Sequence, residues 1–169
     1  YLFHAAAYKH VKYCEKNVCA AVKNNIFGTL NVLNSIKNTD IKFVFVSTDK
    51  AVNPKNVLGM TKRIAEILIV GKNDEYAYKK NKIQIVRFGN VLGSAGSAIP
   101  KFIDQIRNGK PITITDLKMK RYFMNISEAA NLVIESTGIR NKNNQIFILK
   151  MGKQIKIINI AKKLFEFYK

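Results

Sequence analysis

The segment IKFVFVSTDKAVNPKNVLGMTKR, Ile41 to Arg63, decides the fold class of this chain. Its first part, Ile41 to Ser47, is rich in β-branched and aromatic residues, which is typical of a strand buried on both faces. A polar loop with Pro54 follows, and a helical pattern begins at about Val57. A strand, a loop and a helix in this order form the repeating unit of parallel sheets.

The same alternation continues on both sides of this segment. Toward the N-terminus, Leu2 to Ala6 predicts a short strand and Val18 to Ile36 a helix. The helix that begins near Val57 is expected to reach Tyr78. The remaining expected elements are strands at 82–88, 111–115 and 145–150 and helices at 100–108, 127–137 and 157–168. The alternation predicts an α/β fold with a parallel sheet covered by helices.

The composition is strongly basic, with a net charge of +18 over 169 residues. Lysine outnumbers arginine 24 to 5, and the lysines are scattered along the chain. Base readout and bidentate phosphate clamps depend on arginine, so we do not expect a nucleic-acid partner, although a basic nucleic-acid-binding domain stays as a second hypothesis. We find no apolar run long enough to cross a bilayer and no signal-like N-terminal segment.

The cysteines and histidines are too few and too poorly spaced to suggest a metal site. Cys14 and Cys19 point to different faces of an expected helix, and only His4 and His10 could add ligands. We therefore expect no metal and interpret both cysteines as reduced packing residues, which suits a cytoplasmic protein.

Polar clusters follow three of the predicted strands. They are HAAAYKH at 4–10, STDK at 47–50 and GNVLGSAGS at 89–97. Each alone has a plain interpretation, because Ser, Thr and Asp cap helices and glycines make turns. Ligands of open parallel sheets bind beyond the carboxyl ends of the strands, so the shared position of the clusters predicts a binding site there.

Six stretches together resemble one known family. They are FHAAAYKHV, NNIFGTLNVL, VSTDKAVNPKNVLGMTKR, VRFGNVLGSAGSAIPKF, PITITD and RYFMNISEAANLV. Their order and spacing resemble those of the nucleotide-sugar 4,6-dehydratases of bacterial polysaccharide biosynthesis. These are extended short-chain dehydrogenases that act on UDP-N-acetylglucosamine. The resemblance covers essentially the whole chain.

The resemblance implies an NAD(P)-binding Rossmann-like parallel sheet with part of a small C-terminal substrate domain. Residues 1–90 would be the C-terminal part of the Rossmann-like domain, and residues 91–169 would mix substrate-binding and remaining sheet elements. A G-x-G-x-x-G motif and its ribose-binding acid are absent from the expected place, so we expect the front βαβ half to lie outside this fragment. NAD and NADP both stay open as the cofactor.

The family's reaction assigns catalytic roles to five residues. Bound NAD(P) takes a hydride from sugar C4, the C5 proton and the C6 hydroxyl then leave, and the hydride returns to C6, giving a UDP-4-keto-6-deoxy sugar. The resemblance places Thr48 at the C4 hydroxyl, Asp49 as the acid for the leaving hydroxyl and Lys50 as the base for C5. Lys62 would hold the nicotinamide ribose, and Asn25 would support that lysine.

The resemblance also implies binding roles. Ala5, Ala6 and Ser47, together with Lys62, would lie at the cofactor. On the substrate side, Asn90 and Arg121 match positions that contact the diphosphate, and Thr113 and Thr115 would lie near the uridine of UDP-N-acetylglucosamine.

Leu58 departs from the common pattern of short-chain dehydrogenases, in which a tyrosine stands four residues before the lysine. One form of the family's dehydratases carries methionine there and works without a phenol. Leu58 resembles methionine in shape and cannot carry a proton, so it points to this second form, for which we expect retention of configuration at C5. Met60 stands where alanine is usual.

Other readings of the resemblance stay open. The chain could be a truncated or non-catalytic relative that only binds UDP-sugars. A homo-oligomer is compatible with the sequence. Larger members of the family carry transmembrane helices before the catalytic domain, so contact with the cytoplasmic face of a membrane would come only through an upstream segment. The downstream pathway, such as capsule or O-antigen synthesis, is not encoded in these residues.

Overall fold

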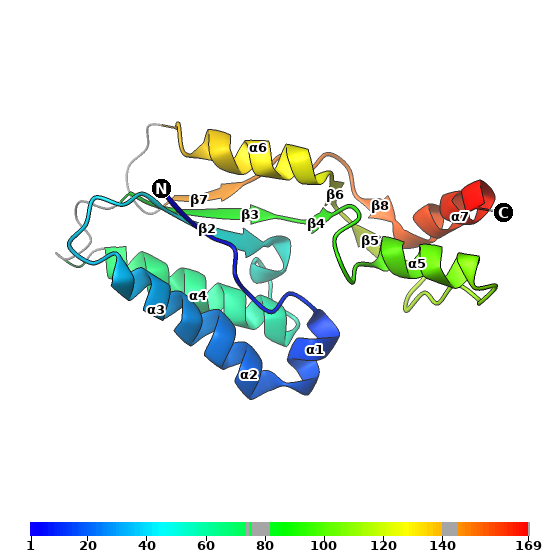
Figure 1. The fold of residues 1–169 in the computed structure, drawn as a ribbon, viewed down its shortest axis with the longest axis horizontal. Helices are drawn as coiled ribbons and strands as arrows, with labels where there is room; N and C mark the ends of the chain where they lie inside the picture. The colour runs from blue at the N-terminus through cyan, green and yellow to red at the C-terminus, as the bar shows by residue number, and fades with distance from the viewer. Residues whose placement is uncertain (74, 76–81, 140–144, 169) are drawn as a thin grey trace. The chain divides into compact units, whose positions relative to one another are not determined.

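The computed structural model describes residues 1–73, 75, 82–139 and 145–168. A sheet of parallel strands is formed by residues of its first half together with residues 145–148. The strands are β1 (Leu2–His4), β2 (Phe43–Thr48), β3 (Ile83–Phe88) and β7 (Gln145–Ile148), in the order β1-β2-β3-β7 (Figure 1). Neighbouring strands are parallel throughout. The predicted α/β fold with a parallel sheet is confirmed.

Helices connect these strands. Between β1 and β2 lie α1 (Val11–Lys16), α2 (Val18–Val22), the π-helical turn η1 (Lys23–Phe27) and α3 (Gly28–Ser35). After β2 come the 3-10 turn η2 (Asp49–Ala51) and α4 (Val57–Asn73). The expected helix from Val18 to Ile36 is present as α2, η1 and α3. Helix α4 ends at Asn73, before the predicted end at Tyr78, and residues 74 and 76–81 lie outside the described residues.

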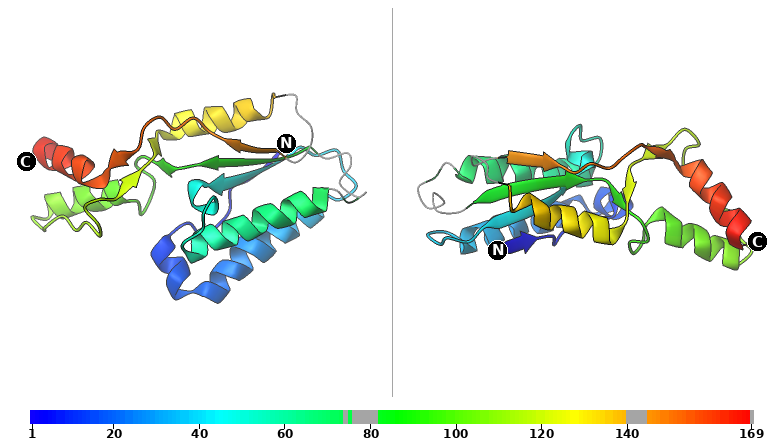
Figure 2. Two further views of the ribbon diagram at one scale, coloured as in Figure 1. Left: turned by 180° about the vertical axis from the view of Figure 1, so that it is seen from behind. Right: turned by 90° about the horizontal axis from the view of Figure 1, so that it is seen from above.

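The core of this sheet lies between its strands and the helices α3 and α4. Figures 1 and 2 show α3 and α4 side by side against one face of the sheet, with the last turn of α6 (Ile126–Ser136) on the other. The buried cluster comprises Leu33, Ile36, Phe43, Phe45, Ala65, Ile69, Ile83 and Ile85. Helices on both faces explain why the middle strands read as nearly continuous apolar runs.

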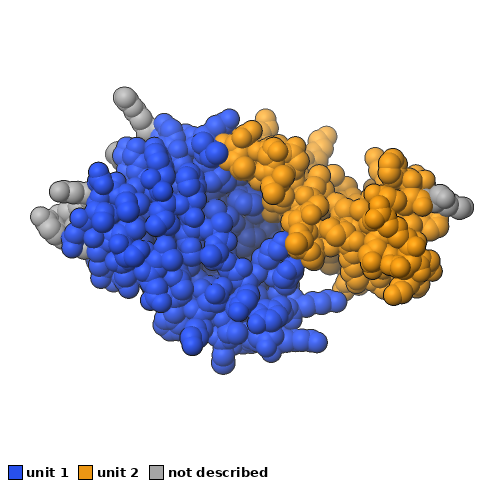
Figure 3. All heavy atoms as spheres, viewed as in Figure 1, with its two compact units in different colours: residues 1–88, 133–149 blue, residues 89–132, 150–169 orange. Residues whose placement is uncertain are grey.

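By its contacts the chain divides into two units, shown in Figure 3. Unit 1 holds residues 1–88 and 133–149, and unit 2 holds residues 89–132 and 150–169. The elements of unit 2 are β4 (Asn90–Val91), α5 (Ala98–Arg107), β5 (Lys120–Arg121), β6 (Phe123–Met124), the first part of α6, β8 (Ile155–Lys156) and α7 (Ile157–Tyr168). The functional division of the chain at residue 90 stays a prediction.

Unit 2 has its own small core and two short ladders. Strands β4 and β6 are parallel, and β5 and β8 are antiparallel. Phe102 of α5 packs with Ile157 and Ala161 of α7. The three expected helices of this region are present, with α7 starting and ending where the sequence predicted.

The strand expected at 111–115 does not form, because its alternating pattern is satisfied in another way. Ile112 and Ile114 pack onto the Phe102 cluster, while Thr113 accepts and donates hydrogen bonds with side chains of α5. Alternation predicts one buried face but does not supply a partner strand. The segment is therefore an extended connection that lies along α5.

The two cysteines behave differently. Cys14 is fully buried in α1, packed with Ala21 and Leu58, as expected for a packing residue. Cys19 is exposed, so its interpretation as a packing residue is wrong. The two lie on separate helices, because Asn17 leaves the helical conformation between α1 and α2.

Two further observations concern only the described residues. None of their helices has the length and apolar character needed to cross a membrane. Nor do they contain a cluster of three or more histidine, cysteine, aspartate or glutamate side chains that could hold a metal ion.

Candidate active site

The carboxyl end of β2 brings Thr48, Asp49 and Lys50 together; we call these residues the triplet. Thr48 is the last residue of the strand and caps the turn η2, where its hydroxyl oxygen accepts from the amide of Lys50 at 3.4 Å. The same hydroxyl donates to Oδ1 of Asp49 at 3.0 Å. Nζ of Lys50 donates to that same oxygen, also at 3.0 Å. One carboxylate oxygen thus joins two groups that can move protons.

The triplet is accessible to a ligand without being fully solvated. The side chains of Lys50 and Asp49 are 22% and 21% exposed. Partial burial strengthens the attraction between the two charges relative to water and restricts their orientations. The predicted catalytic residues of β2 therefore share one small, ordered site.

Gly59, in the first turn of α4, sets how closely this helix approaches the triplet. A Cβ atom at Gly59 would lie 2.4 Å from the carbonyl oxygen of Lys50, which is closer than atoms can pack. Asn56 caps the same turn by accepting from the amide of Gly59 at 2.8 Å. Glycine is required here because the backbone of Lys50 occupies the space of a side chain.

Lys62 lies one turn further along α4 and faces the end of β2. Its side chain is 6% exposed, and Nζ donates to the carbonyl of Val46 at 2.7 Å. The ammonium also lies 4.2 Å from the centre of the Phe45 ring. Desolvation lowers the pKa of Lys62 to about 8, while the nearby Glu66 raises it. A cation held in so dry a place responds strongly to charges around it.

Asn25 is buried within the π-helical turn η1 and holds the connection after β1. Its Oδ1 accepts from the amide of Tyr8 at 2.8 Å, and its Nδ2 donates to the carbonyl of Tyr8 and to Oγ1 of Thr61, each at 3.1 Å. Thr61 directly precedes Lys62 on α4. These bonds join Asn25 to the residue that precedes Lys62, and the support of Lys62 by Asn25 stays a prediction.

The predicted cofactor residues occupy two kinds of place. Ala5 and Ala6 are exposed and follow the end of β1, whose register pairs His4 with Phe45 of β2. Their small side chains leave the edge of the sheet open to a flat ligand. Ser47 is buried instead, and its hydroxyl donates to Oε1 of Glu66 at 2.5 Å. The Ser47 hydroxyl is therefore already engaged inside the protein.

Sequence reasoning missed a buried ion pair beside these residues. Glu66 of α4 is 0% exposed and accepts from Nε of Arg87 at 2.8 Å, from a second nitrogen of the same guanidinium, and from Arg63 at 3.2 Å. Glu66 raises the pKa of Arg87. The signal was present: Arg87 stands among the apolar residues Ile85, Val86 and Phe88 of β3, and such a charge requires a partner.

Leu58, at the position of the common tyrosine, belongs to a hydrophobic cluster. It is 5% exposed and packs with Cys14 and Ala21, so its side chain holds α1 and α2 against α4. Met60, by contrast, is 47% exposed. Leu58 therefore fills a packing role.

The four predicted substrate residues all lie in unit 2. Asn90 starts β4, whose ladder pairs it with Phe123, two residues after Arg121. Arg121 is partly buried, and its guanidinium donates to the carbonyl of Lys120 at 2.8 Å. Thr113 accepts from Lys101 at 2.8 Å and from Gln105 at 3.0 Å, and Thr115 is exposed. Asn90 and Arg121 are thus brought near each other, whereas Thr113 is tied to α5.

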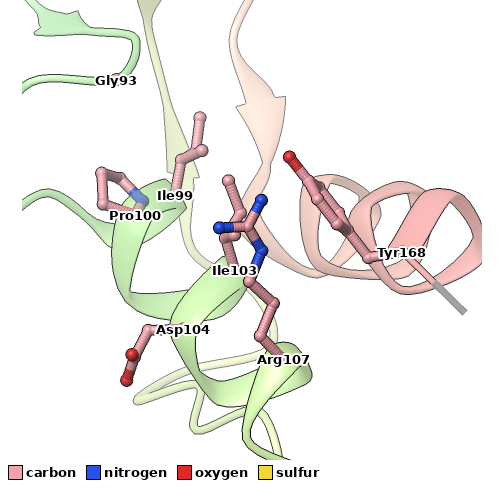
Figure 4. Close-up of a pocket in the computed structure, with 7 residues that line it drawn as sticks. All are labelled: Gly93, Ile99, Pro100, Ile103, Asp104, Arg107 and Tyr168. Atoms are coloured by element: carbon pink, nitrogen blue, oxygen red, sulfur yellow. The ribbon is translucent and has the colours of Figure 1, made fainter.

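Unit 2 also contains a pocket that the sequence did not indicate (Figure 4). It has a volume of about 370 Å³ and is lined by Gly93, Ile99, Pro100, Ile103, Asp104, Arg107 and Tyr168. The guanidinium of Arg107 lies 5.3 Å from the centre of the Tyr168 ring. Tyr168 comes from the other end of the chain, which is why local sequence patterns did not reveal this contact.

Comparisons with known proteins agree on one family. The family described as polysaccharide biosynthesis protein matches residues 1–169. The capsular polysaccharide biosynthesis protein CapD of Staphylococcus aureus is 51% identical over 96% of this chain and 27% of its own length. The UDP-glucose 4-epimerase of Rickettsia canadensis is 41% identical over 89% of this chain and 44% of its own. The chain therefore spans from about a quarter to under half of these relatives.

Solved structures share the fold. The X-ray structure of Pen from Bacillus thuringiensis is 40% identical, with a TM-score of 0.91 over 98% of this chain and 52% of that chain. MoeE5, solved in complex with UDP-glucose and NAD, is 17% identical, with a TM-score of 0.87 over 98% of this chain and 61% of that chain. The match over the whole sequence and the identity to CapD show that this chain belongs to the polysaccharide biosynthesis protein family.

Proposed function

We propose that this chain carries the proton-transfer site and substrate-side residues of a nucleotide-sugar 4,6-dehydratase that acts on UDP-N-acetylglucosamine with bound NAD or NADP. The observation that carries the proposal is the triplet, in which Thr48 and Lys50 share one oxygen of Asp49 at 3.0 Å. These groups can perform the proton transfers for which other enzymes of this fold use a tyrosine. Leu58, which is buried, leaves that task to them.

The names of the relatives support the class of substrate. CapD is a capsular polysaccharide biosynthesis protein, the Rickettsia relative is a UDP-glucose 4-epimerase, and MoeE5 was solved with UDP-glucose and NAD. Two of these names contain a UDP-sugar, and one of them adds NAD. The exposed Ala5 and Ala6 and the buried Lys62 would fit such a cofactor at the ends of β1 and β2.

Each residue of the triplet has one task in this proposal. The cofactor, when bound, supplies the acceptor and donor of the hydride. Thr48 accepts the proton of the C4 hydroxyl and passes its own hydroxyl proton to Oδ1 of Asp49, which gives it to the C6 hydroxyl as that group leaves as water. Lys50, in its neutral form, removes the proton at C5 and returns it there when the hydride adds to C6. In unit 2, the guanidinium of Arg121 would bind the diphosphate, assisted by Asn90.

The hydrogen bonds of the triplet provide a route for the first of these protons. The hydroxyl of Thr48 donates to Oδ1 of Asp49 at 3.0 Å, so the carboxylate can receive the proton that leaves the C4 hydroxyl. Lys50, which donates to the same oxygen, must release its own proton to solvent before it can take the C5 proton. Exclusion of water by a bound sugar would favour the neutral amine, because burying a charge is costly.

A 4-epimerase is the second candidate, because the Rickettsia relative bears that name. Epimerisation needs only the oxidation at C4 and the return of the hydride to the other face, with no base at C5. It would leave Lys50 without a chemical task. The contact of Lys50 with the carboxylate of Asp49 therefore favours the dehydratase.

Product analysis distinguishes the candidates. The full-length natural protein that contains this chain is incubated with UDP-N-acetylglucosamine, and the sugar is followed by proton NMR. A new C6 methyl signal with a 4-keto sugar is the expected result. Inversion at C4 with an intact C6 hydroxymethyl group would establish the epimerase instead. Bound UDP-sugar without any conversion would support a binding protein.

A further inference from the structure

The carboxylate of Glu66, which has no role in the proposed reaction, accepts hydrogen bonds from three residues. Glu66 is fully buried on α4, four residues after Lys62. Its oxygens accept from Ser47, from two nitrogens of Arg87 and from Arg63. A buried carboxylate costs several kcal/mol unless its oxygens are satisfied, so this arrangement needs all of its donors.

Apart from Arg63, which lies on α4 itself, the donors come from the two middle strands of the sheet. Ser47 belongs to β2 and Arg87 to β3, and the sheet register pairs these two residues. Glu66 therefore joins β2, β3 and α4 at a single point. On β2 this junction is Ser47. Thr48, where the triplet begins, is the next residue, and Val46, whose carbonyl accepts from Lys62, is the residue before it.

Glu66 also acts on the charge of Lys62. Around this ammonium lie Glu66 on its own helix, His4 from β1 and the Phe45 ring from β2, while Arg87 of β3 is paired with Glu66. Beyond the end of β2 lies the pair of Asp49 and Lys50. Glu66 raises the pKa of Lys62 against the effect of burial. Burial lowers the pKa of His4, and the charge of Lys62 lowers it further.

We propose that Glu66 is a positioning residue for the proton-transfer site, which fixes the end of β2 through Ser47 and Arg87 and keeps a carboxylate one helical turn from Lys62 on α4. The kinetic part of this inference rests on the proposed dehydratase function. The electrostatic part does not, because it concerns the protonation of Lys62 in the protein without substrate.

A purely structural ion pair would behave differently. Replacing both members of a buried pair by apolar residues is often neutral or stabilising. A pair that serves the fold alone could be replaced in this way without loss of kcat in the folded enzyme, and the titration of Lys62 would have no importance for turnover. The two readings therefore differ in kcat and in the pH dependence of turnover.

The test is the substitution E66Q in the full-length protein, with E75Q as the matched control. Glu75 lies just beyond the end of α4 and forms an ion pair with Lys72 at the surface. Lys62 is titrated by NMR of its side-chain nitrogen, assigned with K62R. We expect the pKa of Lys62 to fall in E66Q, the limb of the pH–rate profile due to Lys62 to shift to lower pH, and kcat to fall roughly 10²-fold. E75Q should match the wild type.

Two further variants keep the test decisive if E66Q fails to fold. E66M/R87M removes both buried charges, and we again expect a lower pKa of Lys62. S47A removes only the hydrogen bond to β2, so kcat should fall while Lys62 titrates as in the wild type. An unchanged titration of Lys62 in folded E66Q or E66M/R87M, or unchanged kcat in S47A, would overturn the inference. If the wild type shows no turnover while the pKa of Lys62 still falls in E66Q, the dehydratase proposal is refuted and the effect of Glu66 on Lys62 stands.

Discussion

The end of β2 in unit 1 and the pocket of unit 2 hold their polar groups in different ways. At the end of β2, the triplet, Lys62 and Glu66 are linked to one another or to the backbone by short hydrogen bonds, and several are buried. In unit 2, Arg121 and Thr113 are bonded to neighbouring exposed groups, and the pocket is largely apolar apart from Asp104 and Arg107. The first arrangement is suited to chemistry and the second to binding.

This difference agrees with the proposal that the end of β2 performs the proton transfers and that unit 2 binds the nucleotide part of the substrate. Groups that transfer protons need fixed geometry, which the buried bonds at the end of β2 provide. Groups that bind a long nucleotide sugar need shape and a few charged contacts, and these tolerate exposure. Substitutions in the two regions should therefore separate kcat from KM.

The largest effect is expected from D49N. The substitution removes the negative charge of Asp49, whose Oδ1 accepts from Thr48 and Lys50, and an amide cannot give a proton to the leaving hydroxyl. General acid–base groups contribute about 10²- to 10⁴-fold, so kcat should fall by that factor while UDP affinity stays within twofold or so of the wild type. Steady-state rates and calorimetric binding of UDP measure the two quantities. D40N, at an exposed position, is the control. A D49N enzyme with full activity would remove Asp49 from the mechanism.

K62M should change stability in a pH-dependent way. The pKa of Lys62 is about 8 in the folded protein and 10.5 in the unfolded chain. Between these pH values the unfolded chain therefore holds a proton that the folded chain has released. Stability of the wild type therefore rises with pH across this window. At pH 7 K62M should be more stable by on the order of 3 kcal/mol, and the difference should vanish toward pH 10.5. Urea denaturation at several pH values tests this, and a difference independent of pH would contradict it.

G59A should move the triplet without touching its side chains. The added methyl would meet the carbonyl of Lys50, so either α4 or the triplet must shift, and a misplacement of this size costs roughly 10²-fold in kcat. Gly71 is the matched control on the same helix, because a Cβ there meets nothing within 4 Å. G71A should keep full activity and gain up to about 1 kcal/mol in stability. Equal activity of the two variants would show that the approach of Gly59 to Lys50 has no importance for the site.

R121A gives the smallest predicted effect and concerns unit 2. Loss of a charge-assisted bond to the diphosphate should raise KM by about tenfold, which corresponds to the energy of one such bond, with kcat nearly unchanged. R107A, in the pocket beside Tyr168, shows whether that pocket takes part in binding. A loss of kcat in R121A with KM unchanged would reverse the assignment of the two regions.

The sheet and its helices could be predicted because local patterns determined them. The run from Ile41 to Ser47 is buried on both faces, and α7 shows clear helical periodicity. The strand expected at 111–115 could not be judged in the same way, since pairing depends on a partner that the pattern does not contain. The exposed Cys19 shows the same limit, because the break at Asn17 sets its orientation.

The candidate site divides along the same line. The triplet is contiguous in sequence, so its residues were identified together, and their hydrogen bonds agree with a shared site. Glu66 and Arg87 are 21 residues apart in the sequence. Ser47, which donates to Glu66, lies beside Arg87 because the register of β2 and β3 pairs these two residues. The π-helical turn that presents Asn25 also left no local signal, because its backbone differs from an α-helix while its side chains do not.

The most direct test of the triplet's role is the reaction of K50M in the full-length protein with bound cofactor. Substrate is added, and both the absorbance of reduced nicotinamide and the C6 methyl signal are followed. If Lys50 is the base for C5, oxidation at C4 still occurs, so reduced nicotinamide accumulates and no methyl signal appears. A methyl signal formed at the wild-type rate would contradict the proposed use of the triplet in place of a tyrosine.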